Sequence, residues 1–506
     1  MEAAQYIMMG FSNAITPLNL FACFLGVLAG TLVGVLPGLG PSAGIAILIP
    51  VTYKLGPTPA LIMMAGLYYG AMYGGSTTSI LVNLPGEAAS VMTCLDGYQM
   101  ARKGRAGAAL GMAAISSFIA GTLGVVGLML LAPPLADFAV SFGSAEYFAL
   151  TILGMSVLTG ITGDSVIKGL ISAAIGLLLA TVGLDTVGQG ARFTFGYWAL
   201  MDGISFISVA VGLFAVGEVL ASVEESQEVS LYKAKLSGLL PNLQDFLACR
   251  WTFVRAFLIG FFMGVVPGHG ATISAFLAYG IEKRVSKHPE LFGTGVIEGV
   301  AAPEGANNAA SAGAMVPLLT LGIPGSGATA VMLGALMIHG LRPGPLLFQN
   351  NPEFVWTVIA SMYIGNVMLL VLNLPLVPMW AQLLRIPYRV LIPLVLAISF
   401  IGVYAVDNSV FEVWVTIVFG VVGYLARKFG YPCAPMVMGL VLGPVMEGAL
   451  RQALALSHGD ITVFVTRPLS AVLLVIAMLS LFSPLLRTAW DRATGKSEAA
   501  LGQSES

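Results

Sequence analysis

Charged residues are scarce in this chain. Only 9% of the 506 residues are Asp, Glu, Lys or Arg, whereas 57% are hydrophobic; an average soluble domain has about 25% charged residues. A soluble fold of this length cannot cover its surface with so little charge. The formal net charge of −2 gives no electrostatic basis for binding nucleic acid.

Motifs for metals, nucleotides and catalysis are also missing. The four cysteines lie far apart and form neither a CxxC pair nor a metal-binding spacing, so we expect them to be small apolar residues within helices. The sequence contains no GxxxxGK[ST], no HExxH and no DDxxD-like acidic cluster. We therefore expect no ATP site, no resident metal or other cofactor, and no enzymatic activity.

Long uncharged segments take the place of these features. A bilayer core about 30 Å thick requires roughly 20 mainly apolar residues per crossing helix, and several runs, such as 106–132, 256–281 and 354–384, contain no charged residue. The short alternating segments of a membrane β-barrel are not seen. The sequence predicts an all-α polytopic membrane protein with about 11 or 12 transmembrane segments, some of them broken or re-entrant.

The chain also repeats itself at about half its length. GVLPGLGP from Gly34 matches GVVPGHGA from Gly264, and LPGEAAS from Leu84 matches IPGSGAT from Ile323. GDSV and DNSV then occupy comparable places further along. These pairs predict a first transmembrane repeat over 1–220, a charged linker over 221–249, a second repeat over 250–488 and a polar C-terminal tail over 489–506.

The basic loops indicate that the two repeats are inverted. Short cytoplasmic loops carry an excess of Lys and Arg, and each strong cluster faces a weak counterpart in the other half. The strong clusters are 102–105, 283–287 and 427–428, against Arg342, Lys54 and the loop of Asp185 and Arg192. An inverted repeat predicts this pattern, because equivalent loops then lie on opposite sides. The basic C-terminal segment does not fit easily, so the side on which the chain ends stays open.

Four Pro-Gly motifs lie within or beside these uncharged runs. At membrane depth an interrupted helix is tolerated where it is buried in protein or lines a polar cavity, and its free N–H groups can hold an anion. The predicted substrate-binding residues are Pro37, Gly38, Gly40, Ser42, Asn83, Pro85, Gly86, Ser90, Pro267, Gly268, Gly270, Thr272, Pro324, Gly325, Ser326 and Thr329. The competing interpretation is that these small residues only permit close helix packing.

Acidic residues at membrane depth are the second signal, because burying an ionisable group there is costly and usually functional. The residues predicted to couple transport to a cation are Glu87, Asp164, Glu304, Asn307, Asn308 and Asp407. Three of these acids also have a structural alternative. Glu87 would stabilise a helix N-terminus, and Asp164 and Asp407 would cap short turns. No Lys or Arg lies inside the four motifs, which favours cation-coupled symport with Na⁺ or H⁺ as the coupling ion.

At these motifs the sequence resembles the large permease subunit of the tripartite tricarboxylate transporters, the TctA family. The resemblance runs from GVLPGLGP through LPGEAASVMTCLDGYQMARKGRAG and PEGANNAASAGAMVPLLTLGIPGSGATAVMLGAL to YPCAPMVMGLVLGPVMEGALRQAL. It implies a multi-pass protein of the bacterial inner membrane that imports tri- or dicarboxylates such as citrate. It also implies Na⁺ coupling, a small TctB-like membrane subunit and a periplasmic TctC-like substrate-binding protein as partners.

Two other functions remain open from the sequence. A passive anion channel or pore would also use polar helix breaks at the membrane midplane. A non-transporting membrane scaffold or sensor could retain the same fold. Active uptake against a gradient would exclude both.

Overall fold

The computed structural model describes residues 2–36, 39–161, 165–185, 190–224, 240–268, 270–383 and 388–493. Nearly all regular structure in these segments is helical, with a single two-stranded antiparallel sheet, β1 (Gly183–Leu184) and β2 (Ala191–Arg192). The all-α polytopic prediction is confirmed. Within the described segments, seven helices are long and apolar enough to cross a membrane, and shorter apolar helices accompany them. The predicted 11 or 12 crossings stay a prediction.

The chain forms two compact units. Unit 1 consists of residues 1–141 and 204–428, and unit 2 of residues 142–203 and 429–506, so each unit combines segments from both proposed repeats.

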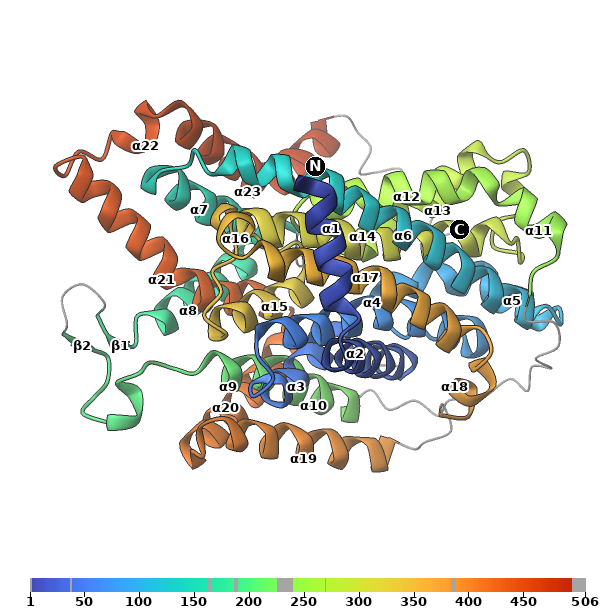
Figure 1. Cartoon of the computed structure of the whole chain (residues 1–506), viewed down its shortest axis with the longest axis horizontal. Coiled ribbons are helices and arrows are strands. Elements are labelled where there is room, and N and C mark those ends of the chain that lie inside the picture. Colours follow the sequence, from blue (N-terminus) through green and yellow to red (C-terminus); the bar gives the residue numbers. More distant parts are fainter. Residues whose placement is uncertain are drawn as a thin grey trace. The chain divides into compact units, whose positions relative to one another are not determined.

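The first part of unit 1 contains α1 (Glu2–Ala14), α2 (Pro17–Val35), α3 (Pro41–Thr52), α4 (Pro57–Val82), η1 (Ala88–Ser90), α5 (Val91–Arg102) and α6 (Ala106–Ala139). Its second part contains α9 (Phe206–Ala210), the π-helical η3 (Val211–Val216), α10 (Gly217–Glu224), α11 (Leu243–Ala248), α12 (Arg250–Val265), α13 (Gly270–Val285), η4 (Pro289–Leu291), α14 (Glu298–Leu321), α15 (Gly327–Ile338), α16 (Pro345–Asn350), α17 (Pro352–Asn373), α18 (Val377–Leu383), α19 (Tyr388–Asp407) and α20 (Val410–Lys428). Figure 1 labels these elements along the chain.

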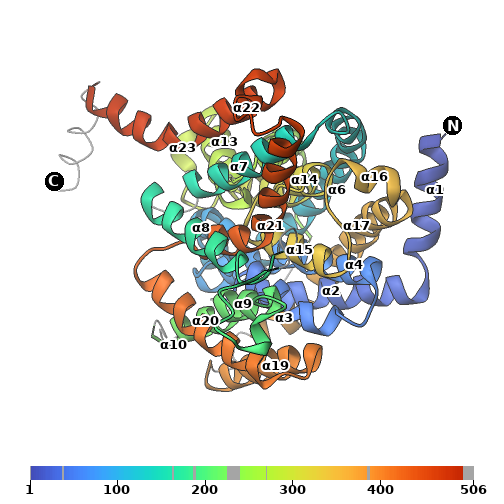
Figure 2. The ribbon, with the colours of Figure 1, turned by 90° about the vertical axis from the view of Figure 1, so that its left-hand side faces the viewer.

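Unit 2 contains α7 (Ser144–Ile161), α8 (Val166–Ala180), the β1–β2 hairpin, η2 (Trp198–Leu200), α21 (Cys433–Leu456), α22 (Val463–Thr466) and α23 (Pro468–Ala493). In this unit, α21 of the second half packs on α7 and α8 of the first half. In unit 1, α9 and α10 of the first half pack with α20 of the second, and Figure 2 shows these three together.

Glycines at four-residue spacing bring the central helices of unit 1 together. On α2, a Cβ at Gly26, Gly30 or Gly34 would lie 2.2–2.4 Å from a backbone carbonyl oxygen of α4. On α12, Gly260 and Gly264 meet carbonyls of α14 in the same way, at 2.2 and 2.3 Å. Small residues let helix backbones approach closely in a membrane. The pairs α2–α4 and α12–α14 therefore pack in the same way, through glycines spaced four residues apart. Close helix packing explains these glycines.

Candidate functional site

Two central helices of unit 1 are interrupted in the same manner. After α4, Asn83 adopts a left-handed conformation with φ of 59°, and after α14, Gly322 does so with φ of 69°. A left-handed residue ends a helix, and a proline shortly after it prevents the helix from continuing. Pro85 and Pro324 occupy that position. Asn83 is exposed and acts as a helix C-cap, so its backbone accounts for its place in the motif.

Each interruption is followed by a new helical segment with a capping box. Glu87 accepts a hydrogen bond from the Ala89 N–H group, while Ser90 Oγ accepts one from Glu87 N–H. In the second half, Ser326 Oγ accepts from Thr329 N–H, and Thr329 Oγ1 accepts from Ser326 N–H at 2.8 Å. The protein itself therefore occupies some of the N–H groups that these breaks expose.

The helix that follows the second interruption contacts α4 within unit 1. Tyr68 on α4 lies with its Oη 3.3 Å from Ser326 Oγ, at the start of α15. The N–H group of Gly268, which follows α12, donates to the carbonyl of Gly325 at 3.1 Å. Gly86 packs against the Gly34 carbonyl at the end of α2. Within each half of the chain, the two Pro-Gly motifs thus lie against each other.

The remaining predicted turn residues are placed less uniformly. Pro37 and Gly38 fall outside the described residues. Gly40 and Ser42 are half-buried at the beginning of α3, and Thr272 is half-buried in the first turn of α13. Pro267 is half-buried, and Gly268 and Gly270 have φ values of +87° and +56°, which favour glycine.

A buried polar cluster lies beside the first interruption. Glu304 on α14 is fully buried; its Oε1 accepts a hydrogen bond from the Thr93 hydroxyl on α5, and its Oε2 has no hydrogen-bond partner. Glu87 is 8% exposed, and its Oε1 has no partner either. The two carboxylates are close enough to interact electrostatically. No basic side chain is among the hydrogen-bond partners described for them, so none of these hydrogen bonds supplies a counter-charge.

Asn307 and Asn308 extend this cluster along α14. Asn308 Nδ2 donates to Asn307 Oδ1 at 2.6 Å and to Ser117 Oγ at 2.8 Å. Asn308 Oδ1 and Asn307 Nδ2 are buried without a hydrogen-bond partner; the Asn307 amide lies near the Glu304 carboxylate without reaching hydrogen-bond geometry. An unpartnered buried polar atom costs about 1–3 kcal/mol. Several of them in one cluster indicate a place for a small polar species.

A small cavity adjoins Asn308. Tyr69, Asn308, Ser311 and Asn366 supply its polar lining. The hydroxyl of Tyr69 is buried without a partner, like Asn308 Oδ1. The cavity therefore extends the group of unpartnered polar atoms from α14 towards α4.

Of the other two predicted acids, Asp164 lies outside the described residues, and Asp407 is not part of this cluster. Asp407 is exposed at the C-terminal end of α19, next to Asn408 with φ of 50°. Its position before the turn into α20 fits the alternative of a turn residue.

Sequence reasoning missed Thr93 and Tyr68, which contact Glu304 and Ser326. Thr93 lies within the long motif that carries the family resemblance, and that was its only signal. Tyr68 is a polar residue in an uncharged helix, and nothing in its neighbouring sequence indicates its partner, because the contact joins residues 258 positions apart.

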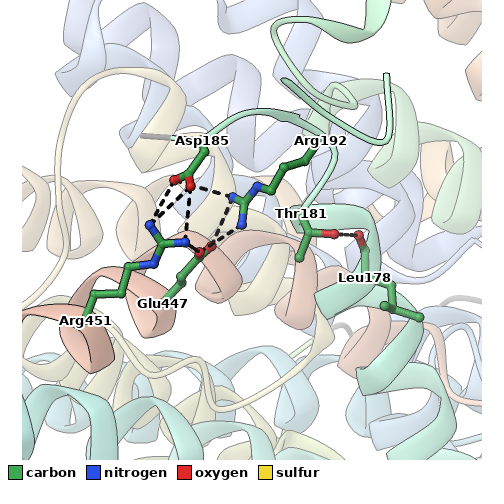
Figure 3. A network of polar contacts seen from close by, with 6 residues as sticks. All are labelled: Leu178, Thr181, Asp185, Arg192, Glu447 and Arg451. Atoms are coloured by element: carbon green, nitrogen blue, oxygen red, sulfur yellow. Dashed lines mark hydrogen bonds and ion pairs between the residues drawn. The ribbon is translucent and has the colours of Figure 1, made fainter. Parts of the chain in front are cut away.

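Unit 2 contains a separate network of charges (Figure 3). Arg192 at the end of β2 pairs with Glu447 on α21 at 2.9 Å, and Arg451 pairs with Asp185 at 3.1 Å and with Glu447 at 2.6 Å. These side chains are 15–38% exposed. The network attaches the β1–β2 hairpin to α21 and includes none of the predicted site residues.

Comparison with known proteins gives one family and two relatives. The family described as "Tripartite tricarboxylate transporter TctA family" matches residues 20–438. An uncharacterized 52.8 kDa protein of the TAR-I ttuC′ 3′ region of Agrobacterium vitis is 46% identical over 486 residues, covering 96% of this chain and 97% of that protein. An uncharacterized protein of the TAR-II ttuC′ 3′ region of the same organism is 45% identical over 227 residues, covering 45% of this chain and 94% of that protein. No solved structure matches.

Proposed function

Because the chain belongs to the tripartite tricarboxylate transporter TctA family of membrane transporters, we propose that it is the large permease subunit of a binding-protein-dependent secondary transporter. It imports small organic anions, namely tri- or dicarboxylates such as citrate. A cation gradient, with Na⁺ as the first candidate and H⁺ as the second, drives the import across the bacterial inner membrane.

The observation that carries this proposal is the meeting of the two interrupted helices beside buried acids. The interrupted helix α4 and the helix start after Pro324-Gly325 come from opposite halves of the chain and contact each other through Tyr68 and Ser326. Transporters place substrate and coupling ions at such breaks, near the interface of their repeats. Helix N-termini and the hydroxyls of Ser90, Ser326 and Thr329 would bind the carboxylates of the substrate.

The acidic cluster supplies the reason for cation coupling. A carboxylate at membrane depth is expensive unless it is neutralised, and both Glu87 and Glu304 retain an unpartnered oxygen. Carboxylate and amide oxygens suit a hard cation. Glu304 Oε2, Glu87 Oε1 and Asn308 Oδ1 are the proposed cation ligands. A bound cation would also reduce the repulsion between these acids and an anionic substrate.

The partners follow from the family as a whole. A small TctB-like membrane subunit and a periplasmic TctC-like binding protein complete the proposed transporter. In the proposed transporter, the binding protein selects much of the substrate.

The test is uptake of labelled carboxylates by proteoliposomes that contain this chain, the small subunit and a binding protein. An inward Na⁺ gradient should drive accumulation above the external concentration, and dissipating that gradient should abolish it. A proton gradient in place of Na⁺ tests the second candidate. Equilibration without accumulation under either gradient would indicate a passive pore and refute the proposal.

A further inference from the structure

Asp96 is a fully buried acid on α5 that the proposed transport site does not use. Its carboxylate accepts hydrogen bonds from three backbone N–H groups, those of Gly293 at 2.9 Å, Gly295 at 2.7 Å and Val296 at 2.8 Å. It also accepts one from the Tyr279 hydroxyl on α13 at 2.8 Å. No basic side chain is among these donors. The Asp96 carboxylate, from the first half of the chain, is therefore bound by N–H and O–H groups of the second half.

The loop before α14 is shaped for this carboxylate. Gly293 and Gly295 have φ values of +88° and +107°, which L side chains rarely adopt. Successive N–H groups in such a turn point inward and form a concave site for an anion. Gly299, in the first turn of α14, lies so close that a Cβ there would be 2.2 Å from Asp96 Oδ2. The space around the carboxylate is therefore closed on this side as well.

This attachment lies one helical turn from the proposed cation site. Thr93, three residues before Asp96 on α5, donates its hydroxyl to Glu304 on α14. The two residues thus attach α5 at two points. Asp96 binds the loop that precedes α14, and Thr93 binds Glu304 within α14. Asp96 accepts hydrogen bonds from four donors, whereas Thr93 donates a single one, so Asp96 provides the firmer attachment.

We infer that Asp96 is a positioning residue, which fixes α5 to the 293–296 loop and thereby holds Thr93 against Glu304. The first part of this inference concerns only the placement of α5. The second part, its consequence for cation dependence, rests on the proposed function.

The chain contains a native reporter for this placement. Cys94 lies between Thr93 and Asp96 and is half-buried, whereas Cys23 is buried on α2. The experiment measures the rate of maleimide labelling at each cysteine by mass spectrometry, in the full-length protein in proteoliposomes. Cation dependence of carboxylate uptake is measured on the same preparations with the partner subunits.

Asp96→Asn keeps the size of the side chain but removes its charge. We expect labelling of Cys94 to become about tenfold faster, because four charge-assisted hydrogen bonds are weakened and α5 opens more often. Tyr279→Phe, which removes one donor and leaves the carboxylate in place, should give a smaller increase. Glu290→Gln is the matched control, since Glu290 is an exposed acid beside the same loop and should change nothing.

The labelling and uptake results separate the two parts of the inference. An unchanged Cys94 rate in Asp96→Asn and in Tyr279→Phe would overturn the positioning role. An equal increase at Cys23 would also overturn it, because it would mean general loosening of the fold. Faster labelling confined to Cys94, together with a several-fold higher cation concentration for half-maximal uptake, is the predicted result. Faster labelling at Cys94 with unchanged cation dependence would support the placement and overturn the proposed cation site.

Discussion

Replacing Gly86 by alanine provides the sharpest test of how the first helix break is packed. The added Cβ would lie 2.0 Å from the Gly34 carbonyl oxygen and 2.7 Å from the Gly75 Cα. Both neighbours are backbone atoms of helices that pack tightly against each other, so no side chain can rotate away. Overpacking a tight interior costs about 1–3 kcal/mol, and this contact lies at the severe end because α2 and α4 must separate.

Gly40→Ala is the matched control for this change. Gly40 belongs to another of the Pro-Gly motifs, has an ordinary φ of −74° and has open space where the Cβ would be. In thermal unfolding of the purified protein in detergent, Gly86→Ala should lower the melting temperature clearly and Gly40→Ala should not. A melting temperature for Gly86→Ala equal to that of the wild type would refute the packing argument.

Four further outcomes follow from the same account. Gly325→Ala should be better tolerated than Gly86→Ala, because its nearest neighbours are 3.3 Å away; equal thermal destabilisation would contradict this. A cysteine at position 342 should react with an impermeant reagent from the periplasmic side, while cysteines at 102 and 283 should not, and the reverse would undo the inverted-repeat prediction. Asn308→Ala should raise the cation concentration needed for half-maximal uptake more than it lowers thermal stability, although it loses hydrogen bonds to Asn307 and Ser117; wild-type dependence would place the cation site elsewhere. Arg192→Ala should alter thermal stability only slightly, since partly exposed ion pairs are weakened by solvent; a large loss would show that the hairpin of unit 2 is a major part of the fold.

Composition was sufficient to predict the class of fold. The long uncharged runs required membrane-spanning helices, and the Pro-Gly motifs marked the ends of α4 and α14 correctly because proline and left-handed residues terminate helices by local chemistry alone. The length of an apolar run and the end of a helix both depend on short stretches of sequence. No knowledge of distant contacts was needed.

The assignment of individual roles required the distant contacts. The glycines of the Pro-Gly turns, Gly38, Gly86, Gly268 and Gly325, look alike in the sequence, but glycine can be needed for a positive φ or for a close backbone approach. The structure gives a positive φ at Gly268 and a close backbone approach at Gly86, and Gly38 lies outside the described residues. Which of the two applies depends on the neighbouring helix, and the sequence of the turn does not contain that information.

The candidate site shows the same limit. Glu304, Asn307 and Asn308 could be selected from sequence because polar residues are rare in these helices. Thr93, the partner of Glu304, could not, since it lies 211 residues away and is one of many hydroxyl residues. Asp96 lies in a motif of the family resemblance, but no role could be assigned to it from the sequence. Its donors are backbone N–H groups of a loop, and the side chains of that loop do not indicate its shape.

Binding of Na⁺ to the purified protein tests the central claim most directly. Titration of radioactive sodium onto the wild-type protein, in parallel with Glu304→Gln and with Glu412→Gln as a buried acid on α20 outside the cluster, measures whether the Glu304 cluster holds the coupling ion. We predict saturable binding to the wild type and to Glu412→Gln, with binding lost in Glu304→Gln. Equal Na⁺ binding by Glu304→Gln and the wild type would contradict the assignment of the cation site.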